Sequence, residues 1–551
     1  MKVAVIQSHI LVGDFAGNAE RLLAAYKKAV ASGTEIVVAQ EDAIAGYCEG
    51  DQRFYPSFLQ AHDAALSVLA KNIGDVGLVM SVTVPNGGQG KPLFNMGVLI
   101  QHGTIKNLQA KTNLATDTVF NDYRWYEPNT LGIEIFEYRG LRLAALICQD
   151  LWEKYDAAHG EHFFTRYPIS ELKGKGVDLL LVPNASPYWW GKGSVREEMV
   201  RDVTRELGCA VLYANYWGGQ DELVFDGRSF IMNKDGVVIG VAPAYADAVV
   251  VADLAGPEVG YFSDQDDINA LEDALVISLR DYVEKNRIKG VVIGLSGGID
   301  SALVAALAVK ALGPEKVVGV RLPSAYSSDG SLTDALALAK NLGIRLETVP
   351  IADVYETLRK SVTPLIGFHE PGEIAGDVTE ENMQARIRGM ILMAFANRFG
   401  FIPIATGNKS EFSVGFATLY GDMCGGFALI KDVLKRDVYR LAENCNRDGI
   451  MIPKNSITKP PSAELRPNQV DSDSLPDYPT LDPILELHIE QSKGVEEIVA
   501  EGFDRKTVKR VVLMTARAEF KRRQAPPGPI VSKEGLAWLN RQYPISTKFL
   551  P

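Results

Sequence analysis

Residues 291–312 read VVIGLSGGIDSALVAALAVKAL, so that an apolar run, a glycine turn and a helical pattern follow one another directly. The apolar run ends at Leu295, the turn is SGG at 296–298, and the helix opens near Asp300. Glycines let the backbone approach an anion, and the N–H groups and positive dipole end of the helix point at that anion. The segment therefore predicts a buried strand, a phosphate-binding turn and a helix, as found in α/β folds.

The rest of the second half continues this alternation. Strand-like runs at 317–323, 345–351 and 401–407 are separated by helical stretches, notably at 331–342 and 382–399. Strands that alternate with helices predict an open, doubly wound parallel sheet with ligands at the carboxyl ends of its strands.

The first half is also a mixture of short apolar runs and helical stretches. Helical patterns occur at 18–32 and 195–207, and the turn KDG at 234–236 indicates a hairpin. This mixture predicts a layered α/β domain of roughly 250 residues. The expected strands are 2–7, 35–40, 77–84, 96–101, 141–148, 178–184 and 210–215.

Between the halves, at 255–267, Gly, Pro and acidic residues interrupt the pattern, and a long amphipathic helix follows. A chain of 551 residues is too long for one hydrophobic core, and its length suggests two to four domains. We therefore expect one domain over 1–262 and a second over 263–551.

The charge balance is acidic, with 57 Lys and Arg against 69 Asp and Glu, a net charge of −12. An acidic surface repels phosphate backbones and anionic lipids, so neither nucleic acid nor a membrane is expected as a partner.

The beginning of the sequence resembles neither a signal peptide nor a membrane span. The five cysteines lack paired CxxC spacing, which favours a cytoplasmic location without disulfides or structural zinc. The Pro-rich stretch 521–530 is expected to be a solvated loop.

The turn at 296–301, SGGIDS, lacks both the GxxxxGK[ST] and the GxGxxG spacing. It resembles the SGGxDS loop of the ATP pyrophosphatase superfamily, whose members adenylate their substrates and release pyrophosphate. The alternative is a glycine-rich turn without a ligand. Asp300 is a candidate Mg²⁺ ligand, because Mg²⁺ prefers carboxylate and phosphate oxygens, and its alternative role is to cap the helix.

Further segments of the second half resemble the NAD synthetases: 322–344, 381–397, 405–433, 457–465 and 521–529. The resemblance implies an adenine nucleotide α-hydrolase-like fold, deamido-NAD as substrate, and ATP as co-substrate with Mg²⁺ as cofactor. Arg386 and Arg388 are two residues apart on a helix and cannot share one face, so neither is included in the site. The implied ATP contacts are Gly294, Leu295, Ser296, Gly297, Gly298, Ile299, Asp300, Ser301 and Thr406; the implied deamido-NAD contacts are Asn382, Glu411 and Lys521; the implied Mg²⁺ ligands are Asp300 and Glu411.

Three predicted strands of the first half end close to a reactive side chain: Glu41, Lys111 and Cys148. A thiol is mostly protonated at neutral pH, so a neighbouring carboxylate can serve as its general base. An ammonium can stabilise the oxyanion of a tetrahedral intermediate, and covalent catalysis divides amide hydrolysis into two easier steps. The alternative for Cys148 is a buried core cysteine, which is the commoner kind.

The order Glu, Lys, Cys resembles the triad of the nitrilase superfamily. Segments 184–192 and 218–230 are similar to the glutaminase domain that some NAD synthetases carry. The resemblance implies a nitrilase-like α-β-β-α sandwich and glutamine contacts from Ser186 and Lys192. The sequence departs from the family at Asp117, where a glutamine-contacting Tyr is usual, and at Gln40 and Gln149, where Pro and Glu are usual.

Together the two resemblances imply a ligase. Glutamine is hydrolysed to ammonia, and the ammonia amidates deamido-NAD after ATP has activated the carboxylate. The expected partners are these small molecules and further copies of the chain in a homo-oligomer. The alternatives are another glutamine-fed adenylating ligase, such as a GMP or asparagine synthetase, and a non-enzymatic nucleotide-binding protein with one degenerate half.

Overall fold

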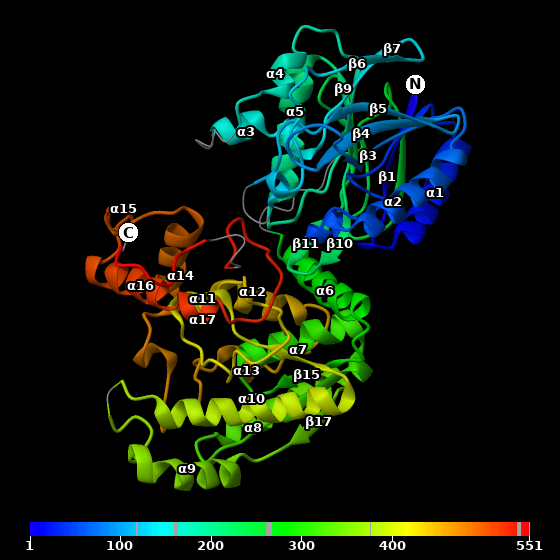
Figure 1. Cartoon of the computed structure of the whole chain (residues 1–551). Coiled ribbons are helices and arrows are strands. Elements are labelled where there is room, and N and C mark those ends of the chain that lie inside the picture. The colour runs from blue at the N-terminus through cyan, green and yellow to red at the C-terminus, as the bar shows by residue number, and fades with distance from the viewer. Residues whose placement is uncertain (117–119, 159–163, 261–266, 375, 537–541, 550–551) are drawn as a thin grey trace. The chain divides into compact units, whose positions relative to one another are not determined.

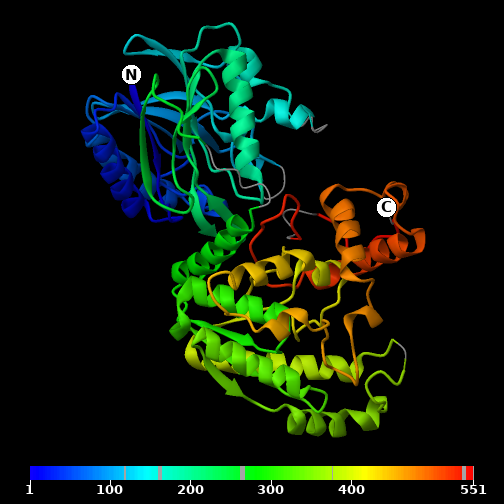
Figure 2. The same ribbon diagram turned by 180° about the vertical axis from the view of Figure 1, so that it is seen from behind.

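A computed structural model describes residues 1–116, 120–158, 164–260, 267–374, 376–536 and 542–549 (Figures 1 and 2). The chain divides into two compact units, Met1–Gly218 with Val224–Asp267, and Gly219–Leu223 with Ile268–Pro551. The expected boundary at 262 and 263 lies outside the described residues. Among the helices in the described part, none is both long and apolar enough to cross a membrane.

The first unit contains two six-stranded sheets. One has the order β14-β1-β2-β3-β4-β5 and the other the order β13-β12-β9-β8-β7-β6. The first consists of β1 (Lys2–Gln7), β2 (Ile36–Val38), β3 (Gly77–Pro85), β4 (Leu93–Gln101), β5 (Thr104–Ala110) and β14 (Ala248–Asp253). The second consists of β6 (Ile135–Tyr138), β7 (Leu141–Ala145), β8 (Leu179–Pro183), β9 (Ala210–Ala214), β12 (Phe230–Met232) and β13 (Val238–Val241), and the expected hairpin joins the last two strands.

Alternation of side chains along the strands produces two core layers. Val3, Val5 and Val38 of the first sheet pack with Leu143 and Leu181 of the second, which forms the interior of the sandwich. The opposite faces are covered by helices, so the expected α-β-β-α layering is confirmed (Figure 1). The helices are α1 (Phe15–Ala31), α2 (Pro56–Lys71), α3 (Glu153–Ala158), α4 (Pro168–Leu172) and α5 (Lys192–Leu207).

Helix α5 illustrates how the outer layer forms. Met199, Val200 and Val203 recur at helical spacing and pack against the face of the second sheet that points away from the sandwich interior. The helix ends at Gly208, which adopts the left-handed conformation (φ 68°) that favours glycine.

The second unit is built on a five-stranded parallel sheet with the order β17-β16-β15-β18-β19. The strand order reverses between β15 and β18, and ligands of doubly wound sheets bind at such a point. The strands are β15 (Val291–Gly294), β16 (Val317–Arg321), β17 (Arg345–Thr348), β18 (Ile402–Ala405) and β19 (Phe427–Ala428). The expected doubly wound sheet is thus present.

Helices cover this sheet and form an additional helical layer. Ile387 and Leu392 of α10 pack on Val292 and Val318, while α7 and α8 contact the strands and each other. A separate core joins α11 to the C-terminal helices. The helices are α6 (Ile268–Lys285), α7 (Ile299–Leu312), α8 (Asp329–Leu342), α9 (Ala352–Ile366), α10 (Thr379–Phe399), α11 (Lys409–Val414), α12 (Lys435–Cys445), α13 (Lys454–Thr458), α14 (Tyr478–Leu485), α15 (Val495–Ala500), α16 (Arg505–Arg517) and α17 (Glu519–Arg522).

Residues 219–223 span the end of β10 (Trp217–Gln220), the turn after it and the start of β11 (Leu223–Asp226), and they belong to the second unit rather than the first. The Gly219 N–H donates to Asp281 at 2.7 Å, and Lys431 pairs with Glu222 at 3.3 Å. The Ile530 N–H donates to the Glu222 carbonyl at 2.8 Å. The Pro-rich stretch is therefore not a solvated loop, since residues 526–531 are largely buried and pair with backbone groups.

Candidate active sites

In the first unit, Glu41, Lys111 and Cys148 follow the ends of β2, β5 and β7, and the fold buries all three. The Lys111 ammonium lies 2.9 Å from Glu41 Oε1. The second Glu41 oxygen accepts the Ala185 N–H at 3.1 Å. The expected strand 141–148 ends at Ala145, and Cys148 begins a short 3₁₀ turn with a positive φ of 46°.

Burial controls the protonation of this cluster. It raises the pKa of Glu41, although Lys111 opposes that shift, and a raised pKa suits a carboxylate that exchanges protons near neutrality. Burial and the Glu41 charge raise the pKa of the Cys148 thiol, while Lys111 acts to lower it. Desolvation alone lowers the pKa of Lys111, but the neighbouring carboxylates of Asp122 and Glu41 raise it well above its usual value. Lys111 is therefore a permanent cation beside the thiol.

Sequence reasoning missed a second carboxylate at Lys111. Asp122 Oδ2 lies 2.8 Å from the ammonium and also accepts a hydrogen bond from the Tyr47 hydroxyl. Tyr47 in turn accepts from Lys111 at 3.3 Å, and the Asn95 amide donates to Glu41 at 2.7 Å. Asp122 is eleven residues beyond the lysine in an irregular segment, where no periodic pattern marks it.

The two side chains expected to contact glutamine come from one end of the same unit. Ser186 is buried, and its hydroxyl accepts a hydrogen bond from Arg196 at 3.2 Å. Lys192 opens helix α5 and its ammonium lies 5.2 Å from the centre of the Trp152 ring. Asp117 lies outside the described residues.

Arg196 holds the Ser186 loop and was not expected from the sequence. Its guanidinium forms two hydrogen bonds to Asp226 and donates to the carbonyls of Ser186 and Pro187. Both partners of this ion pair are almost fully buried. Arg196 therefore joins α5 to the loop after β8 and to β11.

In the second unit a cavity of about 430 Å³ lies at the reversal point of the sheet. This volume suits a nucleotide-sized ligand. The residues expected at this site all line it except Gly297: Gly294, Leu295, Ser296, Gly298, Ile299, Asp300, Ser301, Asn382, Thr406, Glu411 and Lys521.

Gly297 acts through its conformation instead. It has a φ of 78°, and a Cβ at this position would lie 2.4 Å from the Ser331 carbonyl oxygen. Only glycine fits this approach of the turn to α8. The Ser296 hydroxyl accepts a hydrogen bond from the Gly298 N–H at 3.2 Å. This bond stabilises the turn directly before α7.

Asp300 and Glu411 converge on one buried lysine, Lys435. The Lys435 ammonium lies 2.6 Å from Asp300 and 3.2 Å from Glu411. Burial raises the pKa of Glu411, and Asn408 donates to Asp300 at 2.9 Å. Asn408 and Glu411 also form a capping box that begins α11. Lys435, absent from the sequence prediction, thus balances two carboxylates that line the cavity.

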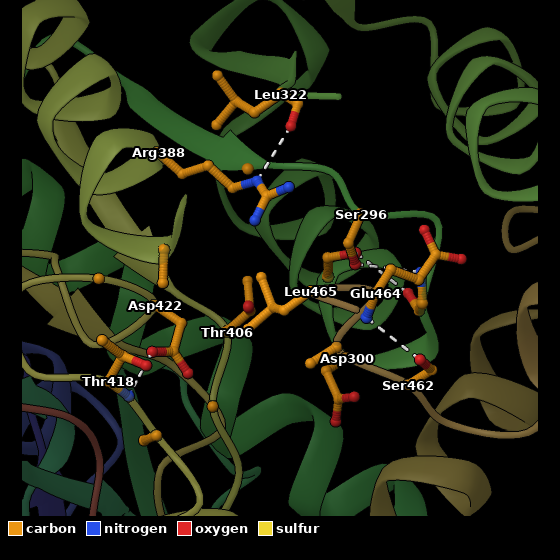
Figure 3. A pocket seen from close by; sticks show the side chains of 18 of the residues that line it. Ser296, Asp300, Leu322, Arg388, Thr406, Thr418, Asp422, Ser462, Glu464 and Leu465 are labelled. Atoms are coloured by element: carbon orange, nitrogen blue, oxygen red, sulfur yellow. Dashed lines mark hydrogen bonds between the residues drawn. The ribbon is translucent and has the colours of Figure 1, made fainter. Parts of the chain in front are cut away.

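Arg388, like Lys435, was left out of the site predicted from the sequence, and it lines the cavity from α10 (Figure 3). Its Nε donates to the Leu322 carbonyl at 3.0 Å. Burial lowers the pKa of its guanidinium to about 10, so it is cationic at neutral pH. Arg386, in contrast, is exposed. Arg388 follows Ala385 by three residues and precedes Leu392 by four, so it lies on their buried face of the helix, a signal that the sequence contained.

Asn382 and Lys521 lie in the part of the cavity formed by α10, α11 and α17. The Asn382 oxygen accepts the Thr418 hydroxyl at 2.6 Å. The Lys521 ammonium donates to the carbonyls of Gly415 and Ala417 at 2.8 and 2.7 Å. Burial lowers the pKa of Lys521.

The fold and the two sites define a two-unit enzyme that joins an amidase to a nucleotide-dependent ligase. Residues 2–261 match the carbon-nitrogen hydrolase family, and residues 271–525 match NAD synthase.

Full-length relatives have the same arrangement. A glutamine-dependent NAD(+) synthetase from Synechocystis sp. is 39% identical, over 100% of this chain and 99% of its own length. One from Xylella fastidiosa is 40% identical, over 100% and 99% respectively. The chain belongs to the family of glutamine-dependent NAD(+) synthetases.

Solved structures show the same fold. A glutamine-dependent NAD+ synthetase from Acinetobacter baumannii, in complex with ADP, superposes with a TM-score of 0.73 at 32% identity, covering 99% of this chain and 98% of its own. A second, from Cytophaga hutchinsonii, has a TM-score of 0.83 at 20% identity, with 100% and 98% coverage. Because its sequence identity is only 20%, the second structure shows a similar fold and nothing more.

The buried ion pair predicts a large effect on stability. Arg196→Met removes two hydrogen bonds from the buried Asp226 carboxylate and leaves it with the Arg228 guanidinium at 4.0 Å, so we expect a loss of about 3 kcal/mol in the free energy of unfolding of the first unit. Tryptophan fluorescence during urea denaturation measures this, because five of the six tryptophans precede residue 218.

Arg124→Met is the matched control, since its ion pair with Asp51 is about half exposed. We expect that variant to lose much less stability than Arg196→Met, because water screens an exposed ion pair. Equal losses for the two variants would contradict the importance assigned to the buried pair.

Proposed function

We propose that the first unit hydrolyses glutamine to glutamate and ammonia, and that the second uses ATP to amidate deamido-NAD with that ammonia. The buried Glu41 and Lys111 beside Cys148 support the first activity. The cavity above the SGGIDS turn supports the second. The expected partition into domains 1–262 and 263–551 is part of this proposal.

In the amidase unit, Glu41 takes the thiol proton as the Cys148 sulfur attacks the amide carbonyl of glutamine. The Lys111 ammonium stabilises the resulting oxyanion. The C–N bond then breaks, ammonia leaves with the proton from Glu41, and a thioester remains. Glu41 next takes a proton from water, which hydrolyses the thioester and releases glutamate and the thiol. Lys192 binds the substrate carboxylate, and Ser186 completes the contacts.

In the ligase unit, the turn at 296–298 and the first N–H groups of α7 bind the phosphates of ATP. Lys435 and Arg388 add positive charge where the α-phosphate is attacked by the nicotinate carboxylate. Pyrophosphate leaves, ammonia attacks the acyl-adenylate, and AMP departs to give NAD. Thr406 contacts ATP, whereas Asn382, Glu411 and Lys521 contact deamido-NAD.

The residues at this site fit a Mg²⁺ ion. Asp300 and Glu411 present hard carboxylate oxygens that converge within reach of one cation, and both line the phosphate side of the cavity. Groups of three or more His, Cys, Asp or Glu suited to a metal do not occur among the described residues. Mg²⁺ usually takes one or two carboxylates and completes its shell with phosphates and water, so two are sufficient. When bound, the ion neutralises phosphate charge.

A homo-oligomer is part of the proposal, supported by exposed apolar side chains on α10. Met390 and Met393 are exposed on one side of this helix, and Tyr420 is exposed beside it. No described side chain of the neighbouring helix α9 is fully buried. An exposed apolar face of this kind is suited to association with another copy. The free cysteines are compatible with the cytoplasmic location that we also propose.

Separate sites predict separable activities. Cys148→Ala should abolish NAD formation from glutamine, because no thioester can form, while NAD formation from an ammonium salt stays within about twofold. Both rates are measured with ATP, deamido-NAD and Mg²⁺ present. Cys209→Ala, another buried cysteine of the same unit, is the control that should retain both activities. Simultaneous loss of both activities in Cys148→Ala would exclude separate sites.

The adenylation site serves either nitrogen source. Asp300→Asn removes a carboxylate from the phosphate side of the cavity, so glutamine-dependent and ammonium-dependent NAD formation should both fall on the order of 100-fold. The matched control is Asp329→Asn, in the first turn of α8, which should retain normal rates. Normal ammonium-dependent turnover in Asp300→Asn would refute the metal-binding role.

The oligomer has its own test. Light scattering on the purified chain should give at least twice the monomer mass, and Met390→Glu with Met393→Glu should reduce it, because charges in an apolar interface are costly. Val68→Glu, on an exposed apolar position of α2, should leave the mass unchanged. A monomeric wild-type chain would contradict the proposal.

A further inference from the structure

Asp150 is a fully buried carboxylate two residues after Cys148, and the amidase chemistry does not use it directly. Its Oδ1 accepts the N–H groups of Thr112 at 3.0 Å and Asn113 at 2.7 Å. Its Oδ2 accepts the Ile147 N–H at 3.1 Å. One side chain therefore binds the backbone directly after Lys111 and the backbone directly before Cys148.

The two segments that Asp150 joins belong to different sheets. Lys111 follows β5 at the edge of the first sheet, whereas Cys148 follows β7 in the second. Ladder hydrogen bonds order strands within a sheet but do not set the distance between residues of two stacked sheets. The Asp150 hydrogen bonds cross from one sheet to the other at the catalytic end of the sandwich.

The conformation of Cys148 increases the need for such a tether. Its φ of 46° lies in the left-handed region, which is unfavourable for a non-glycine residue and persists only when its surroundings enforce it. Asp150 closes the same 3₁₀ turn onto Ile147. The hydrogen bond to Ile147 thus holds the strained residue from its N-terminal side.

We propose that Asp150 is a positioning residue that sets the distance between the Lys111 ammonium and the Cys148 thiol. The proposal rests on the amidase reaction proposed above. Three N–H donors favour the ionised carboxylate, and so does the Lys111 charge, against burial that raises the pKa of Asp150 to about 7. An ionised carboxylate supplies both oxygens as acceptors, which an amide cannot do.

Asp150→Asn tests the tether with a minimal change of shape. Its single oxygen can serve Thr112 and Asn113 or else Ile147, and the NH₂ group then faces a backbone N–H. Lys111 and Cys148 should separate, and a shift of about 1 Å at reacting groups can cost about 100-fold. We expect kcat for glutamate release from glutamine to fall by about that factor, with little change in KM, because Ser186 and Lys192 stay in place.

Glu153→Gln is the matched control in the same unit. Glu153 is also buried and accepts the N–H groups of Ile169 and Ser170, but it contacts none of the candidate catalytic residues. It therefore reports the general effect of losing a buried acceptor. We expect Glu153→Gln to keep kcat within about twofold even where its loss of stability equals that of Asp150→Asn.

A second variant and a second measurement make the test independent of folding defects in the first. Asp150→Glu keeps the charge but moves it by one methylene, and it should also lower kcat, by at least about tenfold. Alkylation of Cys148 by iodoacetamide, followed by peptide mapping, should show a higher pH midpoint in both variants, because the ammonium no longer lowers the thiol pKa. Ammonium-dependent NAD formation verifies that the second unit is folded.

The outcomes are distinct. If the wild-type chain releases no glutamate, the amidase function itself fails. If the wild type is active and both Asp150 variants match Glu153→Gln in kcat and in the alkylation midpoint, Asp150 is only a structural residue and the inference is overturned.

Discussion

The buried Lys111 ammonium, held between the Glu41 and Asp122 carboxylates, is the interaction on which the first unit depends. Removing each charge from water costs several kcal/mol, which is offset only when the partners are close and further hydrogen bonds satisfy them. Tyr47 and Asn95 supply such bonds. The sandwich must therefore bring irregular segments from several strand ends into one cluster that excludes water. The same exclusion of water raises the pKa of the Cys148 thiol.

The second unit repeats this arrangement on an unrelated sheet. Lys435 bridges Asp300 and Glu411, but here the cluster borders a cavity rather than a closed interior. Burial raises the pKa of Glu411, while the Lys435 charge opposes that shift. The position follows from topology, since the strand order reverses between β15 and β18. A parallel sheet directs the turns after both strands to the same edge.

Much of the fold could be predicted from periodicity. The apolar runs at 2–7 and 77–84 became β1 and β3, and the run before the SGG turn became β15. The half-exposed β5 is poor in apolar residues, and the sequence indicated it only through the strand end placed before Lys111. The Pro-rich stretch 521–530 was predicted wrongly, because composition does not reveal that its backbone pairs with residues 222 and 428.

By itself the sequence determined the strand ends at Glu41, Lys111 and Cys148 and the SGGIDS turn, since each follows a local apolar pattern that ends at a polar residue. It also contained the signal for Arg388, through helical spacing. Only the tertiary structure decided that Asp122, Lys435 and Asp150 join these sites. Their partners are distant in the sequence or in another sheet, and no local period records a contact made between elements. A buried charge acquires its role from the groups that the fold brings to it, because they alone offset its loss of water.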